Sequence, residues 1–352
     1  MLVNYFSEED VSQFRLWMEW ADNYVIVAHV SPDGDAVGST LALAQYLQLK
    51  GKNAVTVLPD SPPEFLNWMH GADGIITFDG NPEKAARLIT DADVVCCLDF
   101  NAIGRVAGVA TSLLYSKAKK IMIDHHRDTR PFCDVTLSRP EASSTSELIF
   151  HFICALGDWG SVNRQIAECL CAGMITDTGG FTYNSNSSQF FFVLSQLIDK
   201  DVDKDLIYRR IYHNYSENRL RMTGYVLSEK MEMVPDSGIA LITLTDEEQR
   251  RFSSSKGDTE GFVNLPLQIS GVKFTAFLRE DRKRGIVKIS LRSVDDVPCN
   301  RFASEFFKGG GHLNASGGEF EGSVEECREA FLRAVNSWRS SSEKCIRKIF
   351  NK

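Results

Sequence analysis

Short apolar runs alternate with longer amphipathic stretches through the first half of the chain. The apolar runs predict β-strands, and the stretches between them repeat apolar residues at helical spacing. Strands are expected at residues 24–30, 53–58, 93–99 and 120–124, and helices at 38–50, 82–90, 143–156 and 162–176. Strands that alternate with helices form βαβ units, so this half is predicted to be an α/β domain with a mostly parallel sheet.

The alternation of predicted strands and helices ends near residue 187. Residues 187–230 have helical periodicity and many charges, and they are followed by strands at 238–244, 272–279 and 285–292 and by a helix at 325–338. We therefore expect a first domain in residues 1–190, a helical linker in 191–232, a smaller α/β domain in 233–340 and a polar tail in 341–352.

Composition narrows the class of protein. The 352 residues carry a net charge of −8, which argues against tight binding of long duplex nucleic acid. No apolar run approaches the roughly 18 residues of a membrane helix, and the N-terminus lacks the pattern of a signal peptide. Nine cysteines without a CxxC pair predict neither a disulfide framework nor a zinc finger. We expect a cytoplasmic protein that does not bind membranes.

Residues with metal-ligand chemistry follow several predicted elements. The segment "HVSPDGDAVGS" follows the first strand, Asp99 ends "VCCLD", "IDHH" ends the strand at 120–124, and Asp177 follows the helix at 162–176. Each acid alone is typical of a turn or a helix cap. Together they indicate a single site, because parallel strands place their carboxyl ends along one edge of a sheet. The residues expected to converge there are His29, Asp33, Asp35, Asp99, His125 and Asp177.

Four converging carboxylates would repel one another unless cations lay between them. Asp33 and Asp35 are expected in an extended loop, where both carboxylates can point the same way. Mixed oxygen and imidazole donors favour manganese, with magnesium, cobalt and zinc as alternatives. Six ligands fit two divalent ions that share a bridging carboxylate.

The segments "HVSPDGDAVGS", "CLDFN", "IDHH" and "DTGGF" resemble, in order, the four motifs of the DHH phosphoesterase superfamily. "GGGHLNASGG" and the preceding "KISLRS" resemble the DHH-associated C-terminal domain. The resemblance covers roughly residues 20–335, and the stand-alone nanoRNase group is the most similar subfamily. It implies an N-terminal DHH domain, a smaller C-terminal α/β domain and an active site in the cleft between them.

The resemblance also implies a ligand scheme. One metal ion would be held by His29 and Asp33, the other by Asp35, His125 and Asp177, and Asp99 would bridge both. Of the two remaining motif residues, Asp124 would orient a neighbouring group and His126 would face the substrate. The implied reaction is hydrolysis of a phosphate ester by water that the two metals activate.

The C-terminal motif supplies candidates for substrate binding. A glycine run exposes backbone N–H groups that can bind phosphate, and arginine suits bidentate phosphate contacts. The candidates are Arg292, Gly309, Gly310, Gly311 and His312, with Asn300 as a weaker one that could equally cap a helix.

The subfamily implies short 5′-phosphorylated oligonucleotides, or 3′-phosphoadenosine 5′-phosphate, as substrates. Other functions remain open: a linear or cyclic dinucleotide phosphodiesterase, a RecJ-like single-strand exonuclease, or a non-catalytic nucleotide-binding sensor. Family II pyrophosphatases lack a GGGH segment such as the one found here. A homodimer and a monomer are both compatible with the sequence.

Overall fold

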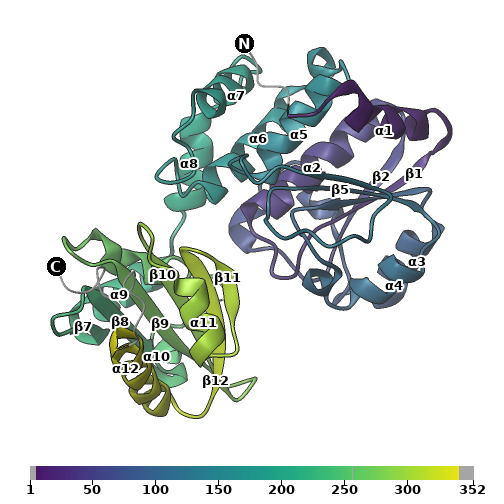
Figure 1. The fold of residues 1–352 in the computed structure, drawn as a ribbon. Helices are drawn as coiled ribbons and strands as arrows, with labels where there is room; N and C mark the ends of the chain where they lie inside the picture. Colours follow the sequence, from purple (N-terminus) through teal and green to yellow (C-terminus); the bar gives the residue numbers. More distant parts are fainter. Residues whose placement is uncertain (1–4, 256, 341–352) are drawn as a thin grey trace. The chain divides into compact units, whose positions relative to one another are not determined.

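The computed structural model describes residues 5–255 and 257–340, which form two compact units (Figure 1). Unit 1 is Met1–Asn214 and unit 2 is Tyr215–Lys352. The division falls inside the segment predicted to connect the domains. Helices α7 (Ser188–Ile198) and α8 (Lys204–Tyr212) pack against α6 (Arg164–Asp177) within unit 1, and α9 (Glu217–Tyr225) opens unit 2. The predicted tail, 341–352, lies outside the described residues.

Unit 1 is built on a six-stranded sheet in which every strand pairing is parallel, in the order β3-β2-β1-β4-β5-β6. The strands are β1 (Asn23–Val27), β2 (Asn53–Leu58), β3 (Ile76–Thr77), β4 (Val94–Leu98), β5 (Lys119–Asp124) and β6 (Val135–Ser138). The predicted parallel α/β domain is therefore confirmed. The strand order reverses between β1 and β4, and open α/β sheets bind ligands beyond the carboxyl ends of strands at such a point.

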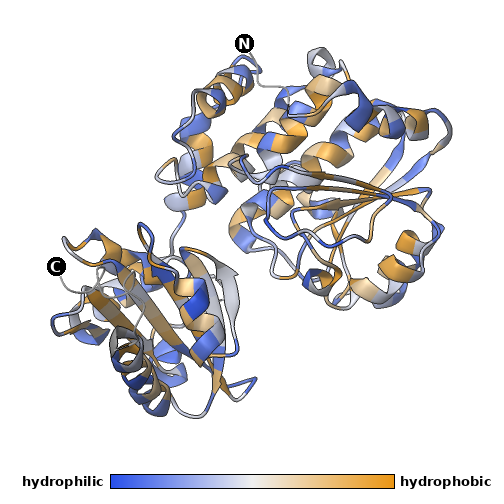
Figure 2. Cartoon of the chain, viewed as in Figure 1, coloured by the Kyte–Doolittle hydropathy of each residue, from blue (hydrophilic) through white to orange (hydrophobic). Residues whose placement is uncertain are grey.

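Helices cover both faces of this sheet (Figure 1). One core contains residues of α1 (Glu8–Trp20), α2 (Gly34–Leu49), α5 (Thr145–Ala155) and α6, and the other contains residues of α3 (Pro82–Asp91) and α4 (Val109–Tyr115). Adjacent strand residues alternate between the cores: Cys96 belongs to the first and Cys97 to the second. Because both faces are buried, the strands are apolar along most of their length (Figure 2).

Two glycines let α2 and α6 pack closely. A Cβ atom on Gly34 would lie 2.5 Å from the Thr176 side chain, and one on Gly38 would lie 2.5 Å from the Cys169 carbonyl oxygen. Such distances are shorter than van der Waals contact, so neither position accepts a larger residue without movement of α6. This close packing brings the N-terminus of α2 beside the C-terminus of α6.

Unit 2 contains a second six-stranded sheet, in the order β11-β12-β10-β9-β8-β7, in which only the β8–β9 pairing is parallel. Its strands are β7 (Met231–Val234), β8 (Ile239–Leu244), β9 (Phe274–Asp281), β10 (Ile286–Ser293), β11 (Gly310–His312) and β12 (Ala315–Glu321). Helices α11 (Cys299–Phe306) and α12 (Val324–Ser340) share one core with the sheet, and α9 contributes to a second core. The short α10 (Asp246–Arg251) follows β8. The predicted smaller α/β domain is confirmed.

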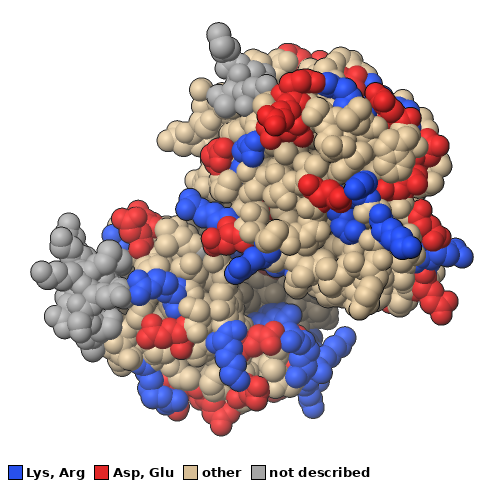
Figure 3. All heavy atoms as spheres, turned by 45° about the vertical axis from the view of Figure 1, so that its right-hand side comes forward, with Lys and Arg blue, Asp and Glu red and all other residues tan. Residues whose placement is uncertain are grey.

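No helix among the described residues is long and apolar enough to cross a membrane. Acidic and basic side chains are interspersed over the face shown in Figure 3. The net charge of −8 therefore coexists with local groups of either sign.

Candidate metal centre

His29 and Asp33 lie in the loop that joins β1 to α2. The His29 Nδ1–H donates to the Val30 carbonyl oxygen at 2.8 Å, which leaves Nε2 facing Asp33 and Asp99. Asp33 is the N-cap of α2, and its Oδ1 accepts from the backbone N–H groups of Asp35 and Ala36 at 3.0 Å each. His29 Nε2 is 3.9 Å from Asp33 Oδ1.

Asp35 corrects one prediction from the sequence. The helix begins at Gly34, four residues earlier than predicted, so Asp35 lies in its first turn and not in an extended loop. A capping aspartate at position 33 explains the early start, because its carboxylate satisfies free N–H groups of the first turn. Asp35 is buried, and its carboxylate is bound by α5: Oδ2 accepts from Thr145 N at 2.6 Å and Oδ1 from Ser146 N at 2.8 Å.

Asp99 lies between two sets of ligands. It directly follows β4, is 2% exposed, and has a φ of +62°, a left-handed conformation that aspartate tolerates better than most residues. Its Oδ2 is 3.4 Å from His29 Nε2, and its Oδ1 is 3.6 Å from His125 Nε2. Each oxygen thus faces a different histidine, which is the geometry that a bridging carboxylate requires.

The two adjacent histidines after β5 have different surroundings. His126 Nδ1–H donates to Asp124 Oδ1 at 2.7 Å, and Asp124 is fully buried at the end of the strand. His125 Nε2 lies 3.4 Å from Oδ2 of Asp177, the last residue of α6. His126 is thus hydrogen-bonded to Asp124 and His125 faces Asp177, while Asp99 Oδ1 lies 3.6 Å from a nitrogen of each ring.

The structure brings all six predicted metal ligands to one region. Potential ligand atoms lie within 4.8 Å of one another in three sets: His29, Asp33 and Asp99; Asp35, His125 and Asp177; and Asp99, His125 and His126. The first two sets match the two-ion scheme, and Asp99 is close to both. His126 also belongs to one set, although its Nδ1 is already bound to Asp124.

Without a cation, burial and the neighbouring charges shift the pKa values of these groups away from their ordinary range. Burial raises the pKa of Asp35 and of Asp177, and neighbouring carboxylates raise both further. Burial lowers the pKa of His29, but the hydrogen bond to Asp99 and its charge outweigh this effect and raise it to about 9. Burial likewise works against ionisation of Asp99, yet the hydrogen bond from His29 and the charges of the nearby histidines hold its pKa well below the usual range.

The donor set fits divalent cations. Asp177 Oδ2 is buried without a hydrogen-bond donor, which is costly unless a positive partner is present. Four carboxylates and two imidazoles provide the hard oxygen and borderline nitrogen ligands that Mn²⁺, Mg²⁺, Co²⁺ or Zn²⁺ accept. A cation at each of the first two sets would let Asp35 and Asp177 ionise.

Sequence reasoning missed the residues that hold the ligands. Thr145 and Ser146 at the N-terminus of α5 donate backbone N–H groups to Asp35, and Thr145 Oγ1 donates to Asp99 Oδ1 at 3.0 Å. The available signal was the run "SSTSE", in which Ser144 caps α5 through Glu147 N. A capping pattern predicts where a helix starts, but not which distant carboxylate its free N–H groups bind.

The predicted substrate residues of unit 2 lie around β10 and β11. Arg292 on β10 and His312 on β11 both pair with Ala315 of β12, so they share one row of the sheet. The Arg292 side chain is half-buried and donates to the Leu291 carbonyl oxygen at 3.0 Å. The side chain of His312 lies outside the described part of the structure. Asn300, in the first turn of α11, accepts from Arg301 N.

The glycine run has structural reasons of its own. A Cβ on Gly309 would lie 1.9 Å from the Gly317 carbonyl oxygen, and Gly311 has a φ of +141°. These two glycines are required for β11 to pair with β12. Gly310 has open space around its Cα, so a phosphate group could approach the backbone there.

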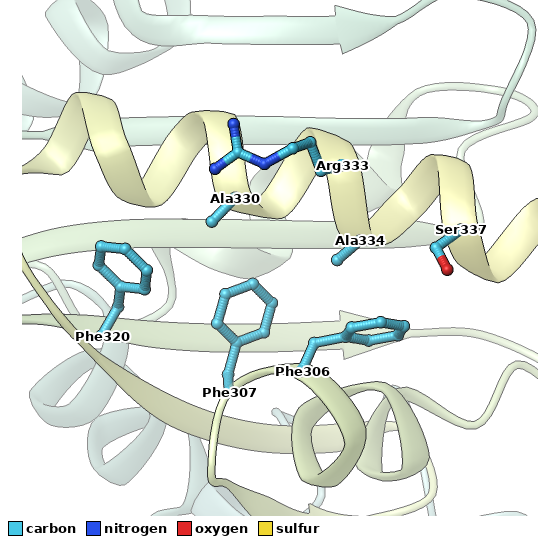
Figure 4. Close-up of a pocket in the computed structure, with 7 residues that line it drawn as sticks. All are labelled: Phe306, Phe307, Phe320, Ala330, Arg333, Ala334 and Ser337. Atoms are coloured by element: carbon cyan, nitrogen blue, oxygen red, sulfur yellow. The ribbon is translucent and has the colours of Figure 1, made fainter.

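A hollow of about 280 Å³ in unit 2 contains none of the predicted site residues (Figure 4). It lies between α12 and three phenylalanines, two at the end of α11 and one on β12. Its lining is mainly apolar and consists of Phe306, Phe307, Phe320, Ala330, Arg333, Ala334 and Ser337. This lining lacks the carboxylates and imidazoles that converge in unit 1.

Known families match both units of the chain. The DHH family, N-terminal domain, matches residues 23–174, and the DHHA1 domain matches residues 240–341. The chain belongs to the DHH family. The N-terminal match contains every residue of the candidate metal centre except Asp177, which lies three residues beyond it.

Relatives of this DHH protein match along its length. A crystal structure of an exopolyphosphatase-related protein from Bacteroides fragilis is 50% identical, with a TM-score of 0.93, and the match covers 96% of this chain and 98% of that one. The bifunctional oligoribonuclease and PAP phosphatase NrnA of Thermus thermophilus is 29% identical over 312 residues, or 88% of each chain. RecJ from Thermus thermophilus, in complex with Mn²⁺, is 14% identical with a TM-score of 0.56 over 96% of this chain and 55% of that one, which shows a shared fold.

Proposed function

We propose that this DHH protein hydrolyses short 5′-phosphorylated oligonucleotides to mononucleotides, and 3′-phosphoadenosine 5′-phosphate (PAP) to AMP. The observation that carries the proposal is the convergence of two ligand sets on Asp99, within a chain similar over 88% of its length to an enzyme named for both activities. Eight described cysteines are free, which supports a reducing compartment such as the cytoplasm.

We further propose that His29 and Asp33 hold one divalent ion, that Asp35, His125 and Asp177 hold a second, and that Asp99 bridges them. When bound, such ions, which we propose to be manganese, would activate water for attack on phosphorus and stabilise charge on the phosphoryl oxygens. The role of Asp124 is to keep the His126 ring oriented through Nδ1, so that His126 can contact a phosphoryl oxygen.

The test is a comparison of hydrolysis rates on several substrates with Mn²⁺ present. The set should contain a 5′-phosphorylated dinucleotide, a longer RNA, PAP, a cyclic dinucleotide, pyrophosphate and polyphosphate. Fastest turnover of the dinucleotide and PAP is expected, with loss of turnover in Asp99→Ala and retention in Asp91→Ala, which changes an exposed acid at the end of α3. Binding of nucleotide without any product would instead favour a sensor.

Polyphosphate hydrolysis is the second candidate function. The observation in its favour is the 50% identity to a protein described as exopolyphosphatase-related. Phosphate release from polyphosphate at a higher catalytic efficiency than from PAP or the dinucleotide would replace the first proposal by this one.

We propose that unit 2 binds the substrate's 5′-phosphate through Arg292, His312, Asn300 and the backbone of Gly309–Gly311. A dinucleotide and PAP both carry a 5′-phosphate and a phosphorus on the 3′ oxygen, so one binding mode would present the same bond for hydrolysis. Open space at Gly310 and the shared row of Arg292 and His312 support this assignment.

Arg292→Ala should weaken the hydrolysis of both substrates together. A lost charge-assisted hydrogen bond is worth about 1.5–3 kcal/mol, or roughly 10- to 150-fold in catalytic efficiency. Removing the 5′-phosphate from the substrate should cost the wild type a similar factor but cost Arg292→Ala little more.

Arg284→Ala is the matched control, because Arg284 lies in the turn just before the same strand and pairs with Glu319 on the surface. If the losses from Arg292→Ala and from the missing 5′-phosphate simply multiply, Arg292 does not bind that phosphate.

A further inference from the structure

The N-terminus of α5 contacts carboxylates from both ligand sets, although none of its residues is a candidate ligand. Thr145 and Ser146 bind Asp35 through their backbone N–H groups, and the Thr145 hydroxyl binds Asp99. Thr145 is fully buried, and it is 110 residues from Asp35 and 46 from Asp99 along the chain. One residue thus connects the two halves of the metal centre.

These contacts restrict both carboxylates. Each oxygen of Asp35 accepts one N–H group, so the carboxylate cannot rotate about its Cβ–Cγ bond without losing a hydrogen bond. Carboxylate oxygens can accept more than one partner, so each keeps capacity for a metal ion. The Thr145 hydroxyl binds Oδ1 of Asp99, the oxygen that faces His125, and Oδ2 faces His29.

The helix end is itself held in place by buried groups. Ser144 Oγ accepts from Glu147 N at 3.0 Å, and Glu147 Oε2 accepts from Ser143 N at 2.7 Å. Glu147 is 2% exposed, and its Oε1 lies 3.9 Å from Nε2 of the buried His151. This arrangement fixes the backbone on both sides of Thr145, which sets the direction of its N–H group.

Helix α6 leaves room for these contacts. A Cβ on Gly173 would lie 2.0 Å from Ser146 Oγ and 2.8 Å from Asp35 Oδ1. The absence of a side chain at residue 173 therefore allows α6 to approach the α5 N-terminus and carry Asp177 into the same region.

We propose that Thr145 is a positioning residue for both metal ions. Its N–H group holds Asp35 and its hydroxyl holds Asp99, so the two ligand sets are arranged before any ion binds. The inference rests on the metal centre of the proposed function and is independent of the substrate. Preorganised ligands avoid the cost of ordering carboxylates when the ion binds.

The experiment compares Mn²⁺ affinity, by calorimetric titration of the metal-free full chain, among the wild type, Thr145→Val, Thr145→Ser and Thr40→Val. Valine keeps the shape of threonine and removes the hydroxyl, so Thr145→Val should weaken Mn²⁺ binding by about 10- to 150-fold. Thr145→Ser keeps the hydroxyl and should stay near the wild type. Thr40 is also fully buried, but its hydroxyl donates to Ala36 O within α2, so Thr40→Val is the matched control and should bind normally.

The thermal midpoint of each metal-free variant shows whether it is folded, and Thr145→Ala replaces Thr145→Val if valine prevents folding. Wild-type affinity in a folded variant without the hydroxyl would overturn the proposal, as would equal weakening in Thr145→Ser. If the wild type binds Mn²⁺ and hydrolyses none of the substrates, the proposed function fails and this inference stands. A wild type that binds no Mn²⁺ overturns both.

Discussion

Adjacent residues His125 and His126 illustrate how two identical side chains acquire different surroundings. Both rings have a nitrogen 3.6 Å from Asp99 Oδ1, but His126 Nδ1 donates to the buried carboxylate of Asp124 at 2.7 Å, whereas His125 Nε2 lies 3.4 Å from Asp177 Oδ2. The local sequence "DHH" is compatible with either histidine as a ligand. The difference comes from which acids the fold places beside each ring.

Substitution of the two histidines should therefore have different effects. His125→Ala should reduce the metal content, because it removes a ligand between Asp99 and Asp177. His126→Ala should retain metal but lower turnover by about 100- to 1000-fold, the typical effect of removing one donor to transition-state charge. Metal analysis beside kinetics measures both effects, with the exposed His70 changed to alanine as the control. The opposite pattern would mean that the roles of the two histidines are exchanged.

The metal-free protein should lose stability as the pH rises from about 6.5 to 9. The pKa of His29 is raised to about 9 in the folded state from its ordinary value of about 6.5, so its stabilising contribution is complete below 6.5 and is lost through 9. The pKa values of Asp35 and Asp177 are also raised, so the folded state keeps their protons up to a higher pH than the unfolded state does. Their ionisation therefore also lowers stability as the pH rises. The lowered pKa of Asp99 stabilises the fold above its unfolded value of about 3.9, a contribution lost only in acid.

Scanning calorimetry after removal of divalent ions measures this dependence. The midpoint should fall between the two pH values, and His29→Gln should reduce the slope. Added divalent cation should raise the midpoint most at high pH, because metals compete with protons for the same ligands. A midpoint that stays constant or increases would contradict these assignments.

The close contact of α2 with α6 determines where three of the acids lie. Asp33 caps α2, Asp35 is in its first turn, and Asp177 ends α6. At Gly34 and Gly38 on α2, an added Cβ would lie 2.5 Å from atoms of α6. The packing of these helices therefore fixes the separation between Asp35 and Asp177.

Gly38→Ala should lower the free energy of unfolding of unit 1 by about 1–3 kcal/mol, the usual cost of overpacking a core. The added methyl group would clash with the Cys169 carbonyl oxygen, which is backbone and cannot rotate away. Denaturant titration measures the effect. Gly104→Ala is the control, since a Cβ there would have no atom within 4 Å. Equal stability of the two variants would show that α6 shifts at little cost.

The distribution of charge over the protein bears on substrate length. The chain has a net charge of −8, and the face in Figure 3 carries both signs of charge. Proteins that bind long nucleic acid without sequence preference use a basic groove that follows the backbone. A protein with this charge balance is better suited to substrates that need only a few positive contacts.

Turnover should therefore decrease as a 5′-phosphorylated RNA lengthens from two to about twenty nucleotides. The rates should be compared at two salt concentrations, because binding of a long polyanion weakens steeply with salt and binding of a dinucleotide does so less. Equal rates on long single strands and on dinucleotides would favour the RecJ-like alternative.

The sequence alone determined the α/β class, the parallel sheet and the six candidate metal ligands. Apolar runs predict buried strands from local information, and parallel strands must end at the same edge, so residues such as His29 and Asp99 could be assigned to one place. The sequence did not show that Asp35 lies in a helix, because the N-cap role of Asp33 depends on where the helix begins.

Only the tertiary structure decided which atoms meet. Thr145 binds both Asp35 and Asp99, and Gly173 leaves the space that lets α6 approach. These contacts join segments separated by 46 and 110 residues, and no local pattern of hydrophobic and polar residues encodes them. They depend on how closely helices pack on the sheet, and that distance is set by side-chain volumes on several elements at once.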